Sequence, residues 1–82
     1  MPDPRERLAR CFSAVFPRLS RDEIARASTS SVAGWDSIAM INLMTVIEEE
    51  MGVSFDPEEL DRLVSFELIL DVLREKTHEI GP

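Results

Sequence analysis

An apolar segment that lies between a helix start signal and a helix stop signal constrains the fold of this chain most strongly. The segment covers residues 37–51, with Asp36 before it and Gly52 after it. Aspartate accepts hydrogen bonds from the free N–H groups of a first helical turn, and glycine readily adopts the left-handed conformation that ends a helix. The pattern therefore predicts a long helix over residues 37–51. Apolar residues cover more than half of its circumference, so the helix either packs on two sides or offers apolar surface to a partner.

Further start signals predict the rest of the architecture. The sequence at 3–6, Asp-Pro-Arg-Glu, reads as a capping box that opens a helix ending before Pro17. A second box at 56–59 opens a short helix, and Ser65 caps a last helix that ends near Lys76. No strand pattern and no internal repeat is present. We therefore predict an all-α fold, a small four-helix bundle of three main helices and one short helix, in a single domain over residues 1–82 with a frayed tail at about 77–82.

The connection over residues 17–36 is long for so small a domain. A weaker capping box at 20–23 predicts one or two helical turns, with Ile24 pointing inward. Interleaved apolar residues are expected to hold the connection against the core: Leu19, Ile24, Val32 and Trp35. A long ordered connection of this kind is usually functional.

Charge is distributed unevenly along the chain. The net charge is −7, which disfavours binding to nucleic acid. Residues 1–35 hold six bases and four acids, a net charge of +2, whereas residues 36–82 hold three bases and twelve acids, a net charge of −9. Between Asp36 and Asp61 there are eight acids and no base. This run is either a solvated face or a docking surface for basic partners.

Two consequences of the acidic run can be tested. Three of its members, Glu48, Glu49 and Glu50, lie at the C-terminal end of the long helix, where negative charge opposes the helix dipole. Because helix stability does not explain this placement, it favours a role for the three glutamates in binding a partner. Crowded carboxylates are also expected to have raised pKa values, so that stability would increase as the pH falls from 7 towards about 5.

The residue inventory argues against several classes of protein. The single cysteine, Cys11, excludes an intrachain disulfide and a cysteine-based zinc site. The single histidine, His78, provides neither a metal-binding cluster nor a general base for a serine hydrolase. We therefore predict that the protein is not an enzyme and binds no metal. No apolar run reaches the roughly 20 residues of a membrane span, and no signal-peptide pattern is evident, so a cytoplasmic location is expected.

Ser37 occupies a position with a distinctive chemical property. It would be the first residue of the long helix, directly after the capping residue Asp36. A phosphodiester attached to its hydroxyl would face free backbone N–H groups and the positive end of the helix dipole. A serine that follows a loop is also accessible to a modifying enzyme.

The residues around Ser37 resemble a known family. Gly34-Trp35-Asp36-Ser37-Ile38 resembles the Asp-Ser-Leu attachment motif of acyl carrier proteins, and residues 37–53 look like the recognition helix of that family. The resemblance covers essentially the whole chain. It implies that Ser37, next to Asp36, carries covalent 4′-phosphopantetheine, whose thiol tethers acyl intermediates as thioesters.

The resemblance also implies partners. These are a phosphopantetheinyl transferase and acyl-loading and acyl-processing enzymes with basic docking patches. We expect the docking face on the long helix to contain Ile38, Ile41, Glu48 and Glu49. The carrier is expected to be a monomer of the stand-alone type.

Several residues depart from the pattern of fatty-acid carriers. Ala39 and Asn42 stand where many of those carriers have acids, Thr45 replaces a frequent methionine, and Trp35 before the Asp-Ser pair is unusual. These departures favour a specialised pathway, such as polyketide, peptide-hybrid or modified-lipid assembly. Two alternatives stay open: a peptidyl or aminoacyl carrier, although the Gly-Gly-x-Ser pattern of those carriers is absent, and an unmodified acidic helical interaction module.

Overall fold

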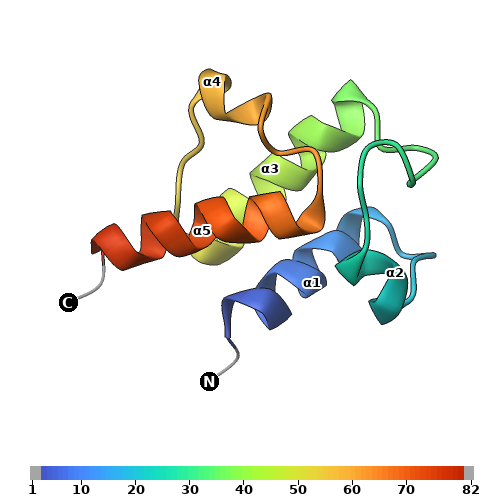
Figure 1. Cartoon of the computed structure of the whole chain (residues 1–82), viewed down its shortest axis with the longest axis horizontal. Coiled ribbons are helices and arrows are strands. Elements are labelled where there is room, and N and C mark those ends of the chain that lie inside the picture. Colours follow the sequence, from blue (N-terminus) through green and yellow to red (C-terminus); the bar gives the residue numbers. More distant parts are fainter. Residues whose placement is uncertain (1–2, 81–82) are drawn as a thin grey trace.

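The computed structural model describes residues 3–80, and for 77–80 it describes the backbone alone. The described part is all-α and contains no strand, only an isolated antiparallel bridge between Ser28 and Ser65. Its helices are α1 (Pro4–Val15), α2 (Arg21–Ala25), α3 (Ser37–Met51), α4 (Pro57–Leu60) and α5 (Phe66–Ile80). Figure 1 shows α1, α3 and α5 as the three long elements, with α2 and α4 in the connections between them. The predicted fold class is confirmed.

The two short helices lie where the sequence predicted a short helix and one or two helical turns. The box at 20–23, which had looked the weaker signal, is complete: the N–H of Glu23 donates to Ser20 Oγ at 3.2 Å, and the N–H of Ser20 donates to Glu23 Oε1 at 2.8 Å. This reciprocal capping stabilises α2, which confirms the one or two helical turns predicted within the long connection. Ile24 points inward as predicted and is 2% exposed.

The ends of the long helices follow local signals with one exception. Asp36 caps α3, and Gly52 ends it in the left-handed region at φ 68° and ψ 32°. Ser65 Oγ accepts a hydrogen bond from the N–H of Leu68 at 3.2 Å, as a capping residue of α5 should. The exception is the far end of α5, which stays helical to Ile80 instead of ending near Lys76. Residues 81 and 82, the rest of the tail expected to fray, lie outside the described residues, as does the side chain of His78.

The core forms around α1, which packs against α2, α3 and α5. Phe12 is fully buried at its centre, with ring centroids 5.4 Å from Trp35 and 5.3 Å from Phe66 in edge-to-face geometry. Such pairs stabilise a fold beyond the area that they bury. The remaining fully buried side chains come mainly from α1, α3 and α5: Leu8, Leu43, Ile47, Leu63, Ile69, Leu70 and Leu73.

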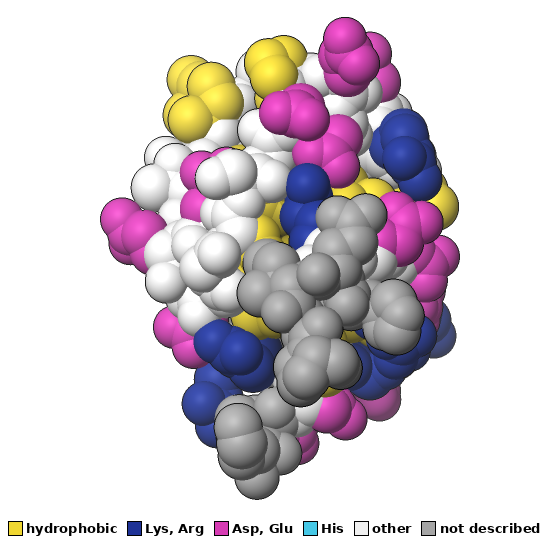
Figure 2. Space-filling model, turned by 90° about the vertical axis from the view of Figure 1, so that its left-hand side faces the viewer, with side chains coloured by type: hydrophobic (Ala, Val, Ile, Leu, Met, Phe, Trp, Pro, Cys, Tyr) yellow, Lys and Arg dark blue, Asp and Glu magenta, His cyan; other side chains and the backbone are white. Residues whose placement is uncertain are grey.

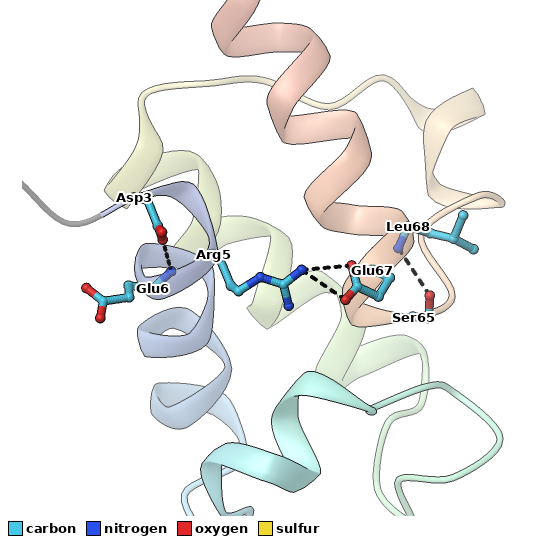
Figure 3. A network of polar contacts seen from close by, with 6 residues as sticks. All are labelled: Asp3, Arg5, Glu6, Ser65, Glu67 and Leu68. Carbon is cyan, nitrogen blue, oxygen red and sulfur yellow. Dashed lines mark hydrogen bonds and ion pairs between the residues drawn. The ribbon is translucent and has the colours of Figure 1, made fainter.

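Polar contacts tie α1 to the two other long helices. Figure 3 shows the Arg5 side chain extending from α1 to Glu67 at the start of α5, where Nη2 lies 3.1 Å from Oε1. The guanidinium of Arg7 donates to the backbone carbonyl of Glu50 in the last turn of α3. Arg7 therefore places positive charge at the helix end where the three glutamates oppose the dipole.

Candidate attachment site

Ser37 is the first residue of α3, and its side chain is exposed. Asp36 precedes it with an extended backbone, and its carboxylate oxygen Oδ1 accepts a hydrogen bond from the N–H of Ala39 at 2.9 Å. Within the described residues, the N–H groups of Ser37 and Ile38 have no acceptor, as is usual in a first helical turn. The positive end of the helix dipole and two free donors thus lie beside the Ser37 hydroxyl.

The loop before Ser37 is fixed by Trp35. The indole is 6% exposed and packs on Phe12 and on Phe16, whose ring centroid lies 5.9 Å away. Gly34 precedes it at φ +124°, a conformation that side chains rarely adopt. A buried anchor two residues before Ser37 therefore fixes the position of the serine at the helix start.

The same connection is joined to the segment before α5. The N–H of Thr29 donates to the carbonyl of Val64 at 2.9 Å, and the N–H of Phe66 donates to the carbonyl of Ala27 at 3.0 Å. These contacts join the segment after α2 to the segment that leads into α5, beside the loop that carries Ser37. The prediction that this connection is ordered agrees with them.

An open pocket of about 480 Å³ lies beside Ser37. Its walls come from the loop, from the first turns of α3 and from α4: Thr29, Trp35, Asp36, Ser37, Met40, Ile41 and Leu60. The indole Nε1 of Trp35 is buried without a hydrogen-bond partner. The pocket is mainly apolar, so it can receive an apolar group tethered to Ser37. An exposed hydroxyl, free donors and this pocket together suit the covalent attachment of a phosphopantetheine arm.

The expected docking residues do not all lie in equivalent environments. Ile38 and Ile41 are 71% and 63% exposed, and the exposed Glu49 follows them on the same strip of α3. Glu48 lies at the edge of this strip and is half-buried, because its Oε2 accepts a hydrogen bond from the N–H of Phe55 at 2.9 Å. One oxygen of Glu48 is therefore already used within the fold.

Two residues that we did not assign to docking complete the strip. Asn42 and Thr45 are exposed between Ile41 and Glu49, and the Thr45 hydroxyl donates back to the carbonyl of Ile41 at 2.9 Å. Helical spacing from Ile38 could have identified both. Figure 2 shows exposed hydrophobic side chains beside acidic ones at the upper end of the face in view.

Metal ligation and membrane insertion are two further features to consider for the described residues. Among these residues, no three His, Cys, Asp or Glu side chains are placed to hold a metal ion. None of the described helices is long and apolar enough to cross a bilayer.

The fold and the site define a small helical carrier with an exposed serine at a helix N-terminus. The model of the phosphopantetheine attachment site family matches residues 6–73. The chain belongs to this family, whose members carry covalent 4′-phosphopantetheine on a serine and are carriers rather than enzymes. Searches of curated proteins and of solved structures find no match. Family membership decides against the unmodified interaction module that the sequence had left open.

Proposed function

We propose that Ser37 is the attachment site and that the protein is an acyl carrier. The observation that carries this proposal is the exposed hydroxyl of Ser37 at the N-terminus of α3, inside the region that matches the family. Phosphopantetheine bound there would supply a terminal thiol that holds acyl groups as thioesters. Asp36 would keep the first turn of α3 in place, and the free N–H groups would stabilise the phosphodiester charge.

Carrier proteins of this family interact with transferases and with biosynthetic enzymes. For this chain we propose a phosphopantetheinyl transferase and acyl-loading and acyl-processing enzymes of a specialised pathway. The proposal rests on Trp35, Ala39 and Asn42, which depart from the fatty-acid pattern. The cytoplasmic location and the monomeric state stay predictions from the sequence.

The docking face that we propose is the strip from Ile38 through Ile41 to Glu49, with Glu48 at its edge. Exposed isoleucines supply apolar contact area, and the acidic end of α3 supplies charge complementary to a basic patch. The strip begins next to Ser37, so an enzyme bound there would have its active site within reach of the attached arm.

The attachment proposal is tested by intact-mass measurement after incubation with a phosphopantetheinyl transferase and coenzyme A. The wild type should gain the mass of one phosphopantetheine group, and Ser37→Ala should gain none. Ser54→Ala, which removes an exposed serine beyond the C-terminal end of α3, is the matched control and should be modified like the wild type. An adduct on Ser37→Ala, or none on the wild type, would refute the assignment.

A second experiment separates acyl from peptidyl carriers. The modified protein is offered to acyl-loading enzymes and to amino-acid-activating enzymes, and thioester formation is followed by mass. We expect loading with acyl groups. Loading with amino acids alone would support the peptidyl carrier instead, without affecting the assignment of Ser37.

A further inference from the structure

The segment between α3 and α5 is held differently from the rest of the fold. Val53 and Leu63 are buried in the core, whereas every residue from 54 to 62 is exposed or half-buried. No Cα atom of α4, which lies in this segment, comes within 8 Å of a Cα atom of another described helix. Figure 1 shows α4 standing apart from the three long helices. We call residues 54–62 the strap.

Side chains from the helices before and after the strap hold it in place. From α3, Glu48 Oε2 accepts a hydrogen bond from the N–H of Phe55 at 2.9 Å. From α5, the Lys76 ammonium donates to Glu59 Oε1 at 2.9 Å, and its Nζ lies 5.4 Å from the centroid of the Phe55 ring. Lys76 therefore contacts the strap at two points, one before α4 and one within it.

The contact between Lys76 and Glu59 is partly withdrawn from solvent. Each of the two side chains is only 21% exposed, so water screens their attraction less than it screens an ordinary surface pair. Glu59 Oε1 also accepts the N–H of Asp56 in the capping box of α4. Loss of the ammonium would therefore leave the first turn of α4 capped but would release it from α5.

The strap also forms part of the wall of the pocket beside Ser37. Leu60 lines that pocket together with Trp35. Leu60 and Phe55 are the apolar side chains of the strap that pack against the core, and both are only half-buried. Segments with few buried apolar contacts open locally while the rest of a fold stays intact. The strap thus combines weak apolar attachment with a place next to the attachment site.

We propose that the strap is a lid on the pocket beside Ser37 and that Lys76 is the latch that keeps it closed. When the strap swings away between its buried ends, Val53 and Leu63, Leu60 leaves the pocket wall and the space beside Ser37 widens. The functional part of this inference rests on the proposed attachment, because a group carried on Ser37 would enter the widened space. Lys76 is then a positioning residue that acts through α4.

Amide hydrogen exchange, measured by NMR on the unmodified protein, tests the latch. The N–H groups of Phe55, Asp56, Glu59 and Arg62 are hydrogen-bonded, so their exchange requires the strap to open. In the wild type they should exchange faster than amides of the core, and urea should change their rates little, because local opening exposes little surface. Lys76→Met should accelerate them about fivefold, as expected for the loss of a partly buried ion pair. Lys76→Arg, which keeps the charge, should restore slow exchange.

A core variant provides the matched control. Ile24→Val removes a methylene group from a buried side chain of α2 and destabilises the whole fold by a comparable amount. Amides that exchange only when the whole chain unfolds should accelerate in this variant. The strap amides should keep their wild-type rates, because opening of the strap leaves α2 packed.

The indole N–H of Trp35 reports whether opening reaches the pocket. It is buried, and the indole shares the pocket wall with Leu60, so its exchange should accelerate together with the strap amides in Lys76→Met. An indole rate unaffected by Lys76→Met would show that the strap is not a lid on this pocket. Strap amides that exchange only with global unfolding, or that accelerate equally in Ile24→Val, would overturn the proposal, as would an unaltered rate in Lys76→Met. Since no phosphopantetheine is present, a failure of these tests is distinct from a failure of the attachment at Ser37.

Discussion

At the scale of single residues, two side chains with nucleophilic atoms differ in what they can do chemically. Ser37 is exposed at a helix start, whereas Cys11 is 2% exposed in the core. Burial, with a smaller contribution from the charge of Glu50, raises the pKa of the Cys11 thiol to about 11, and Arg7 opposes this shift. The thiolate is the reactive form of cysteine, so Cys11 is a core residue and a poor nucleophile.

This difference predicts a selective labelling result. At pH 8, roughly one Cys11 thiol in a thousand would be ionised, so the unmodified native protein should resist iodoacetamide. After phosphopantetheine attachment, the protein should take up one label, on the exposed thiol of the arm. Intact mass measures both states, and denatured protein, in which Cys11 reacts, is the control. Rapid labelling of the native unmodified protein would show that Cys11 is more accessible than the structure indicates.

At the scale of the helix, α3 divides its surface between the core and solvent. Leu43, Met44 and Ile47 are buried, and the opposite strip exposes Ile38 and Ile41. The apolar excess of this helix, which the sequence could explain in two ways, therefore includes isoleucines exposed to solvent, and we propose that they contact a partner. Two contacts within the fold occupy part of the acidic end of α3. Glu48 Oε2 accepts a hydrogen bond from the N–H of Phe55, and the guanidinium of Arg7 donates to the carbonyl of Glu50.

The docking strip predicts a graded response to substitution. Glu49→Lys should slow association with a phosphopantetheinyl transferase several-fold, and the effect should shrink as salt is added, because the changed charge acts mainly during encounter. Surface plasmon resonance at low and high salt measures the association rate. Glu75→Lys makes the same charge change at an exposed position of α5 away from the strip. Equal effects of the two variants would remove the strip from the proposed interface.

At the scale of the whole molecule, the acidic half of the chain is partly neutralised by its own contacts. Glu59 Oε1 accepts the N–H of Asp56 at 2.8 Å and the ammonium of Lys76 at 2.9 Å. The backbone N–H of Asp56, followed by Lys76, lowers the pKa of Glu59 below its ordinary value of 4.5. The expectation that crowding raises the pKa values in this run is wrong for Glu59, because specific donors outweigh repulsion between carboxylates.

The lowered pKa of Glu59 determines how its contribution to the stability of the fold changes with pH. A carboxyl group with a lowered pKa in the folded state stabilises the fold above pH 4.5, and this contribution is lost as the pH falls through its folded pKa. Glu59→Gln should therefore lower Tm at pH 6 by a few degrees, equivalent to at most about 1 kcal/mol, and the difference should vanish near pH 3. Thermal melts from pH 7 to 3 test this, with Glu58→Gln as the neighbouring control. A wild-type Tm that rises steadily from pH 7 to 5 would show that repulsion dominates after all.

Much of the fold and the position of the proposed attachment serine could be predicted from the sequence, because their signals are local. Asp36 and Gly52 determined the ends of α3, and with them the place of Ser37 at a helix start. Capping residues act on N–H groups within a few residues of themselves, so a linear reading suffices. The same local reading predicted helical turns at α2, although the box at 20–23 looked weak and proved complete.

Only the tertiary structure determines which side chains of the proposed docking face are free to bind a partner and which are already bonded within the fold. The sequence gives Glu48 and Glu49 the same charge, but only the fold brings the N–H of Phe55 to Glu48. A pocket at the end of α1 likewise joins residues near 15–19 to residues near 32, which no local periodicity connects. The contact between residues 15–19 and Val32 depends on how the helices pack around Phe12, and that packing is a property of the whole core.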